Sequence, residues 1–264
     1  MKKQNLWTRD ELIVALHLYW GIPYNKISGT SNQKIQNFAS LIGRKPAAVA
    51  FKLMNFTSID PERQRKGNRG KTSAGKLDKI IWNEYFNQWE KLSYDSTILL
   101  AKLQNKKPEE IFDIDNELKA LRGFDIERIV KTRVNQNDFR NRILASYDEK
   151  CCITGINIKS LLVASHIIPW SKNKKERLNP QNGLCLNSIH DKAFDDGLIT
   201  ISTDYKVVLS EILLSKINDL SIQKFFIGYE NFKITLPNRY IPDREFLHWH
   251  NTNVFQNYSD GRNM

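Results

Sequence analysis

The segment CCITGINIKSLLVASHIIPWSKNKKERLNPQNGLCLNSIHDKAFDDGLITIS, residues 151–202, decides the fold of the second half of this chain. Its apolar run at 161–163 predicts a short strand that leads into a histidine. The Asn-Pro-Gln-Asn-Gly stretch at 179–183 is typical of a turn. The residues from 188 to 194 are typical of the start of a helix. The expected order is therefore strand, loop, strand and helix.

Three polar side chains stand out in these pieces: the first strand leads into His166, the loop contains Asn182, and the helix contains His190. A neutral imidazole with its ordinary pKa of about 6.5 can take a proton from water at physiological pH. One divalent ion can polarise a phosphate and stabilise the leaving alkoxide. An asparagine in the loop can hold the histidine ring in place through a hydrogen bond. Metal-assisted hydrolysis of a phosphodiester is a reaction that needs residues of these types.

The segment resembles the HNH, or ββα-metal, nuclease motif of restriction, homing and colicin nucleases. The lead-in at 133–155 is similar to that of a bacterial HNH subclass common in restriction enzymes. The elements typical of that subclass match Ala-Ser-His-Ile at 164–167, the turn at 177–183 and the ending at 190–197. The resemblance covers about 70 residues and implies a compact metal-dependent nuclease domain.

By position, the resemblance implies that His166 is the general base, Asn182 the motif asparagine and His190 a metal ligand. Ser165 stands where many HNH sites place a second ligand, Asp or His, and a hydroxyl is a weaker ligand for a hard cation than a carboxylate. We expect Mg²⁺, Mn²⁺ or a similar ion, bound by His190 and Ser165 together with water. Three further side chains remain alternative ligands: Asp191, Asp195 and Asn187.

The three cysteines do not form a disulfide framework on this pattern, and a reducing cytoplasm fits them. Many HNH proteins bind a structural zinc ion through two Cys-x-x-Cys pairs. Here Cys151 and Cys152 are adjacent and Cys185 is alone, so a four-thiolate site cannot be built and no structural zinc is expected. No apolar run reaches the length of about 18 residues that a membrane span needs.

Charge points to a polyanionic partner. The chain carries 40 basic and 29 acidic residues, a formal net charge of +11. Residues 1–95 hold 16 basic and 8 acidic residues, so most of the excess lies in the first part. A basic surface attracts nucleic acid through counterion release. We therefore expect a DNA partner that the first part binds.

Helical patterns fill that first part. Thr8 with Glu11 predicts a capping box, residues 32–41 a second helix, and Pro46 the first turn of a third. Residues 60–76 predict a basic, glycine-rich loop, and residues 77–92 a further helix. We expect an α+β protein with a basic helical DNA-recognition domain at 1–95, a connecting segment at 96–130 and an HNH nuclease domain at 131–264, whose core motif spans 147–202.

Basic side chains of the first domain are candidates for DNA contacts. Three of them are expected to face phosphates: Arg44, Lys45 and Lys52. Five more belong to the loop that could enter a groove: Arg63, Arg65, Lys66, Arg69 and Lys71. Residues 42–61 resemble a domain, fused to HNH modules in bacterial restriction proteins, that senses modified cytosine. Reading such a base needs an aromatic or apolar pocket, and candidates are Trp7, Tyr19, Trp20, Tyr24 and Phe56.

The leading hypothesis is an HNH restriction endonuclease that cuts double-stranded DNA carrying 5-methyl- or 5-hydroxymethylcytosine. A conventional restriction enzyme that reads an unmodified site is the alternative within nucleases. A DNA-binding protein with an inactive HNH fold is the alternative from another class, and Ser165 is the feature that leaves it open. One HNH centre cuts one strand, so a double-strand break needs two centres. We therefore expect a homodimer.

Overall fold

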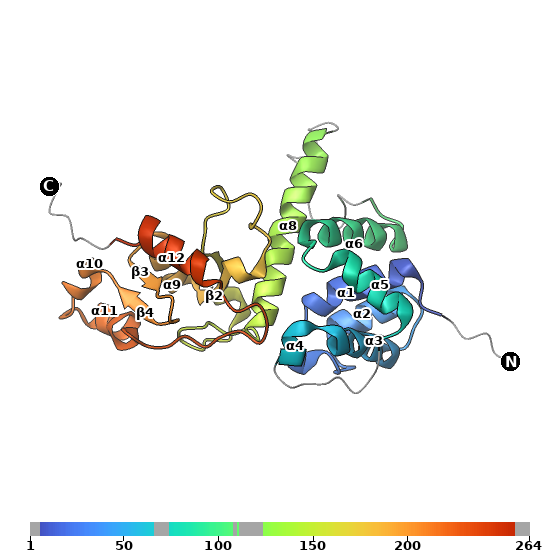
Figure 1. Cartoon of the computed structure of the whole chain (residues 1–264), viewed down its shortest axis with the longest axis horizontal. Helices are drawn as coiled ribbons and strands as arrows, with labels where there is room; N and C mark the ends of the chain where they lie inside the picture. The colour runs from blue at the N-terminus through green and yellow to red at the C-terminus, as the bar shows by residue number, and fades with distance from the viewer. Residues whose placement is uncertain (1–5, 66–73, 108–109, 111–123, 257–264) are drawn as a thin grey trace. The chain divides into compact units, whose positions relative to one another are not determined.

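The computed structural model describes residues 6–65, 74–107, 110 and 124–256 (Figure 1), with the side chains of 124–130 excepted. The chain divides into two compact units, residues 1–145 and 146–264. This division differs from the expected boundaries. Residues 96–103 continue a helix of the first unit instead of starting a connecting segment, and most of a long helix beginning at residue 124 also belongs to that unit.

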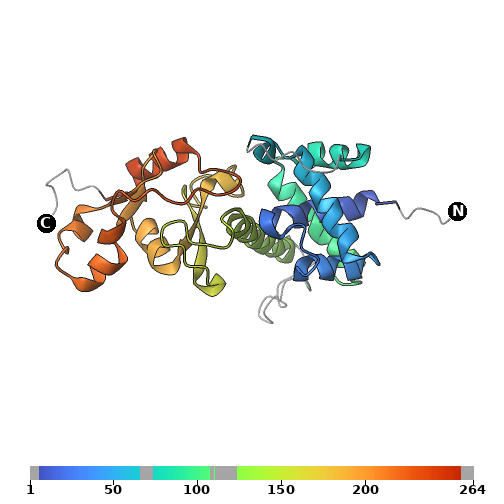
Figure 2. The same cartoon turned by 90° about the horizontal axis from the view of Figure 1, so that it is seen from below.

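The first unit is helical (Figures 1 and 2). Its helices are α1 (Arg9–Trp20), α2 (Gln33–Leu41), α3 (Pro46–Ile59), α4 (Pro61–Arg65), α5 (Lys76–Tyr85), α6 (Trp89–Leu103) and α8 (Phe124–Ser146, whose last residue belongs to the second unit). Helix α1 packs against α3, α5 and α6, and α2 packs against α3. Helix α1 is therefore the centre around which the bundle is built.

Local signals in the sequence correctly placed the starts of the first three helices. The Thr8 hydroxyl accepts a hydrogen bond from the Glu11 amide, and the Glu11 carboxylate accepts one from the Thr8 amide, which is the predicted capping box. Asn32 caps α2, and Pro46 occupies the first turn of α3. The aromatic rings of Tyr19 and Phe56 are buried in the core.

Two expectations for this unit need correction. The predicted single helix at 77–92 is two helices, α5 and α6, because the chain turns at Asn87, whose φ is 60°. A left-handed residue ends an α-helix locally. The expected loop at 60–76 begins with the short helix α4. Residues 66–73 of that loop lie outside the described residues.

The second unit contains the predicted strand, loop, strand and helix. Strands β1 (Leu162–His166) and β2 (Gly183–Asn187) are antiparallel, with His166 opposite Gly183. Helix α9 (Ser188–Asp195) follows β2 directly and packs against both strands. The unit continues with β3 (Ile199–Ile201), β4 (Val207–Leu209), α10 (Glu211–Leu214), α11 (Leu220–Phe225) and α12 (Arg244–Asn253). Strands β3 and β4 form a second antiparallel pair.

Gly197, which follows α9, allows the chain to pack closely against the segment after α12. Gly197 has a φ of 70°, and a side chain there would overlap the carbonyl oxygen of Val254, just after α12. The amide of Gln256 also donates to the Gly197 carbonyl at 2.9 Å. Only a residue without a Cβ allows the two segments to approach this closely.

The fold as a whole is α+β, as the sequence predicts: a helical first unit, and a second unit with two small antiparallel sheets. Within the described part of the chain, no helix has the length and apolar character to cross a membrane.

Candidate nuclease centre

His166, the last residue of β1, is held by the loop that follows it. Its Nε2 atom lies 2.9 Å from the backbone carbonyl oxygen of Arg177. Because a carbonyl only accepts, Nε2 carries the proton, and in the neutral ring Nδ1 is the basic nitrogen. Burial lowers the pKa of His166 below its ordinary value and the Arg177 charge lowers it further, while the bond to the Arg177 carbonyl opposes this. The imidazole is therefore kept neutral at physiological pH.

Asn182 is fully buried and fixes the same loop. Its Oδ1 accepts from the amide of Ile168 at 2.8 Å, and its Nδ2 donates to the carbonyl of Ile168 at 3.1 Å and to that of Glu176 at 3.4 Å. The expected hydrogen bond to the histidine ring is replaced by these backbone contacts. Asn182 thus orients His166 through the backbone, because Glu176 precedes the residue whose carbonyl holds the ring.

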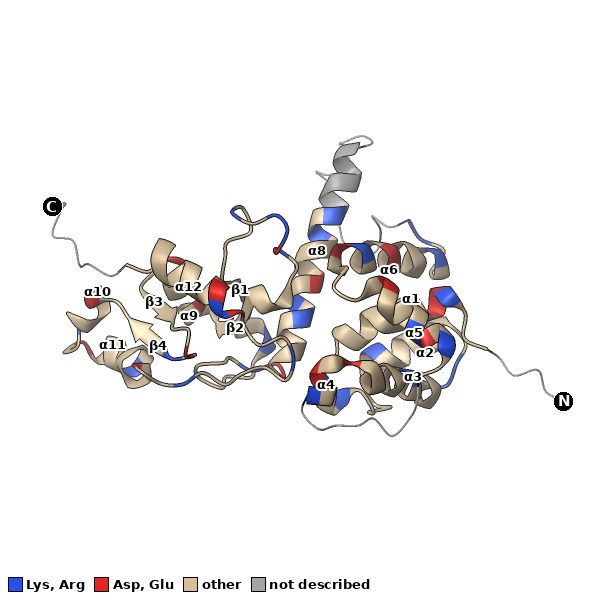
Figure 3. Cartoon of the chain, in the orientation of Figure 1, with Lys and Arg blue, Asp and Glu red and all other residues tan. Residues whose placement is uncertain are grey.

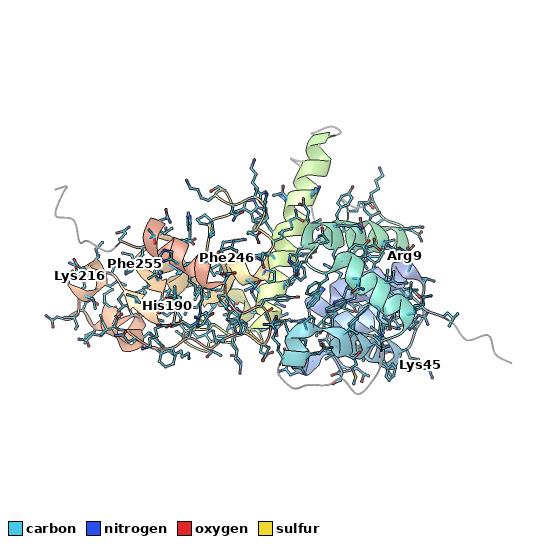
Figure 4. The ribbon with its side chains drawn as sticks, viewed as in Figure 1. Arg9, Lys45, His190, Lys216, Phe246 and Phe255 are labelled. Carbon is cyan, nitrogen blue, oxygen red and sulfur yellow. The ribbon has the colours of Figure 1, made fainter. Side chains whose placement is uncertain are left out.

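His190 does not have the geometry expected of a metal ligand. Its Nδ1 accepts from the side-chain amide of Asn187 at 2.8 Å, and its Nε2 donates to the carbonyl of Phe225 at 2.7 Å. The ring is 3% exposed, lies inside the second unit (Figure 4) and contacts the edges of Phe226 and Tyr229. Both nitrogens are engaged within the protein, so the structure supports an anchoring role and gives no support to metal binding by this residue.

The partners of His190 form a polar cluster at the start of α9. The Asn187 side-chain amide lies 3.3 Å from Thr154 Oγ1 and 3.7 Å from Cys151 Sγ, and its Oδ1 caps the helix. Burial raises the pKa of the Cys151 thiol, but hydrogen bonds with His190 and Thr154 outweigh it and bring the pKa to about 7. These hydrogen bonds fasten α9 to the segment that precedes β1. Cys152 and Cys185 are buried, as expected of small apolar residues.

A second face of α9, about 100° around the helix from His190, carries two carboxylates. Asp191 and Asp195 lie one helical turn apart, and Asp191 contributes to raising the pKa of Asp195 to about 6, after the larger effect of partial burial. Burial also raises the pKa of Asp191, and the Ser165 hydroxyl beside it partly offsets this. Because Ser165 directly precedes His166 in β1, the carboxylates and His166 lie at the same end of the strand.

The side chains of Ser165, Asp191 and Asp195 have the chemistry to bind a hard divalent cation. The Ser165 hydroxyl is buried without a hydrogen bond of good geometry, and two neighbouring carboxylates with raised pKa values gain from a positive charge between them. No cluster of three or more His, Cys, Asp or Glu side chains suited to a metal occurs among the described residues. Mg²⁺ commonly uses only one or two protein carboxylates, with water and substrate phosphate completing its shell. Asp191 and Asp195 therefore replace His190 as the candidate ligands.

The loop between β1 and β2 adds a basic surface that the sequence analysis did not single out (Figure 3). Lys172, Lys174 and Lys175 are exposed on it, and the guanidinium of Arg177 lies 4.7 Å above the ring of Trp170. The ring of Trp170 in turn meets His166 edge-on, with 5.5 Å between centroids. The run Ser-Lys-Asn-Lys-Lys-Glu-Arg at 171–177 was the available signal for this surface.

In the first unit, several expected DNA contacts are engaged within the protein. Arg44 pairs with Glu11 at 2.9 Å, and Lys52 pairs with the buried carboxylate of Asp78 at 2.8 Å. Both cations therefore stabilise the bundle, which corrects their assignment as phosphate contacts. Lys45 is exposed at the edge of the unit (Figure 4) and remains a candidate for contact with a DNA phosphate.

The candidate DNA contacts of the expected basic loop fall into two groups. Arg63 stacks on the ring of Tyr24, and Arg65 forms an ion pair with Glu62. The three remaining candidates lie outside the described residues: Lys66, Arg69 and Lys71.

A cavity of about 600 Å³ opens among α1, α2, α6 and α8. Trp20 and Phe38 provide aromatic walls, and Trp20 is the one aromatic candidate of the five expected that lines it. His17 bonds to Asp138 at 2.7 Å on the polar wall. Burial raises the pKa of Asp138, but His17 and then Arg142 outweigh it, so the carboxylate stays ionised. The cavity thus combines flat apolar surfaces with fixed charges.

Comparison with known proteins bears on the second unit. A search of curated proteins with the whole chain gave no match. A family model, described as HNH endonuclease (HNH_2), matches residues 151–202. The matched range contains β1, the basic loop, β2 and α9. The strand that carries His166, the loop that orients it and the helix that carries the carboxylates therefore lie in a segment that matches the HNH endonuclease family, which supports a nuclease.

Proposed function

We propose that this chain is a divalent-metal-dependent DNA endonuclease of the modification-dependent restriction type. The observation that carries the proposal is the orientation of His166, whose Nε2–H donates a hydrogen bond to the Arg177 carbonyl while two carboxylates lie at the same end of β1. A neutral imidazole with one nitrogen fixed is the arrangement that a general base requires.

In the proposed reaction, Nδ1 of His166 takes a proton from a water molecule. The resulting hydroxide attacks the phosphorus in line with the bond to the leaving oxygen. Asn182 keeps the loop, and with it the imidazole, in place throughout. Asp191 and Asp195 would hold the cation, which polarises the phosphate and stabilises the leaving alkoxide when bound. An inactive HNH fold is the less favoured alternative, because the carboxylates of Asp191 and Asp195 would supply the cation ligand that Ser165 provides only weakly.

The first unit would select the DNA. Contacts to phosphates carry no sequence information, so a nuclease centre needs a separate reader. The cavity beside Trp20 has the volume and aromatic walls to accept a modified base, and the ionised Asp138 could accept a hydrogen bond from the amino group of cytosine. One centre cuts one strand, so we propose that a homodimer makes double-strand breaks.

The first experiment is cleavage of matched supercoiled plasmids, unmodified or carrying 5-methyl- or 5-hydroxymethylcytosine. Each plasmid is incubated with Mg²⁺, with Mn²⁺ and with EDTA. Cutting of the modified plasmids alone, with metal alone, is the expected result. Equal cutting of unmodified DNA would support the conventional restriction enzyme instead, and absence of cutting with every metal would support the inactive DNA-binding protein.

A second experiment tests the carboxylates without relying on activity. The Asp191→Asn variant should bind Mn²⁺ about tenfold or more weakly in a titration followed by electron paramagnetic resonance, because even outer residues of metal sites contribute that much. Asp196→Asn is the matched control, because Asp196 lies beside the same helix and pairs with Lys192. Equal Mn²⁺ affinity of the Asp191→Asn variant and the wild type would remove Asp191 from the site.

A further inference from the structure

The side chain of Arg177 has a position that the folded protein alone does not explain. Its guanidinium carbon lies 4.7 Å from the ring centroid of Trp170, and its Nε is buried without a hydrogen-bond partner. Within the described part of the chain, no hydrogen bond or ion pair is formed by this guanidinium group. Arg44, by contrast, forms two hydrogen bonds to the carboxylate of Glu11.

Such an arrangement is unfavourable in the absence of a ligand. A buried donor of a charged group that lacks a partner destabilises the folded protein, because its lost contacts with water are not replaced. The positive charge also lies near His166, which must become positive when it accepts a proton. An anion bound at the guanidinium removes both disadvantages, because it supplies the acceptor and screens the imidazolium from the arginine.

We propose that the guanidinium of Arg177 binds a non-bridging oxygen of the phosphate that is cut. One residue then serves the reaction twice: its carbonyl oxygen orients the His166 ring, and its side chain positions the substrate beside that ring. Trp170 holds the guanidinium plane by stacking and contacts the imidazole with its edge. The planar, forked donor set of arginine suits phosphate oxygens. This inference rests on the proposed nuclease function.

Cleavage of plasmid DNA in single-turnover conditions tests the proposal with four proteins: wild type, Arg177→Ala, Arg177→Lys and the control Lys216→Gln. Lys216 is an exposed cation of the same unit that lies outside the basic loop between β1 and β2. Loss of one donor to transition-state charge typically costs about 100-fold to 1000-fold in rate. We expect a loss of that size for Arg177→Ala, a smaller loss for Arg177→Lys and a near wild-type rate for Lys216→Gln. Guanidinium ion at a low, non-denaturing concentration should partly restore the Arg177→Ala variant.

A rate for Arg177→Ala within a few-fold of the control would overturn the proposal. So would a loss that neither lysine nor added guanidinium ion restores, because that pattern belongs to a structural role. A binding assay in EDTA separates this outcome from failure of the nuclease function. There, Arg177→Ala should lower the slope of log affinity against log salt concentration by about 1 relative to wild type. An unchanged slope would count against Arg177 even if the wild type cuts no DNA.

Discussion

Replacing His190 by alanine distinguishes an anchoring histidine from a metal ligand. The imidazole is 3% exposed and forms two hydrogen bonds, at 2.8 Å to Asn187 and at 2.7 Å to Phe225. Leaving those two buried groups unsatisfied costs about 1–3 kcal/mol each, and the space left by the ring adds a cavity cost. We expect the free energy of unfolding of the second unit to fall by about 3–5 kcal/mol.

Thermal unfolding makes this loss measurable. For a unit of about 120 residues (146–264), each kcal/mol corresponds to about 4 °C in Tm, so the shift should be about 12–20 °C. A milder variant, His190→Gln, keeps a donor for the Phe225 carbonyl and should lose less stability. At a temperature where both proteins are folded, His190→Gln should bind Mn²⁺ within a few-fold of wild type.

The opposite pattern would refute this reading of His190. If His190→Gln unfolds at the wild-type temperature but binds Mn²⁺ more than about tenfold more weakly, the imidazole is a ligand and not an anchor. The Asp191→Asn variant provides the comparison on the same helix, because it should reduce Mn²⁺ affinity and leave Tm almost unchanged.

Three other perturbations have defined outcomes. His166→Ala should abolish plasmid cleavage while DNA affinity in EDTA stays at the wild-type value; retained cleavage would exclude this histidine as the general base. Burial lowers the pKa of His250 to about 4, against an unfolded value of about 6.5. Its contribution to stability, up to about 3 kcal/mol, is therefore complete above pH 6.5 and lost as the pH falls towards 4; the Tm of His250→Gln should depend less on pH over that range. Gly197→Ala should destabilise the unit by several kcal/mol in urea unfolding, whereas Gly155→Ala, at a similar φ of 74° with open space around it, should cost about 1–2 kcal/mol; equal losses would show that the contact with Val254 does not matter.

The sequence was sufficient where a feature depends on neighbouring residues. The capping box at Thr8, the cap at Asn32 and the first-turn proline at 46 act within one helical turn, and each begins a helix as predicted. The strand, loop, strand and helix of the second unit also followed from local patterns. Turn residues and apolar periodicity determine such elements without reference to the rest of the chain.

Features that depend on distant partners could not be read in this way. Arg44 and Lys52 look like DNA contacts until Glu11 and Asp78, which are 33 and 26 positions away, are placed beside them. The direction of the His190 ring depends on the carbonyl of Phe225, 35 residues later. In both cases the residue type was correct for the expected chemistry, and the partner determined its role.

Helix α9 shows why His190 and Asp191 have different roles although they are adjacent in the sequence. Successive residues of a helix are rotated by about 100°, so His190 and Phe194 lie on one face and Asp191 and Asp195 on another. The first face is anchored: His190 bonds to the end of α11, and Phe194 stacks on His250 of α12 with 3.7 Å between ring centroids.

The second face is therefore held in position by residues that lie beyond the matched range 151–202. Two neighbouring carboxylates disfavour each other's ionisation when no cation is bound, so contacts made elsewhere must hold the helix that carries them against the strands. The anchoring of α9 by α11 and α12 supplies that constraint. The segment that matches the endonuclease family thus contains the groups proposed to react, and we expect the C-terminal helices to hold those groups in the arrangement that cation binding needs.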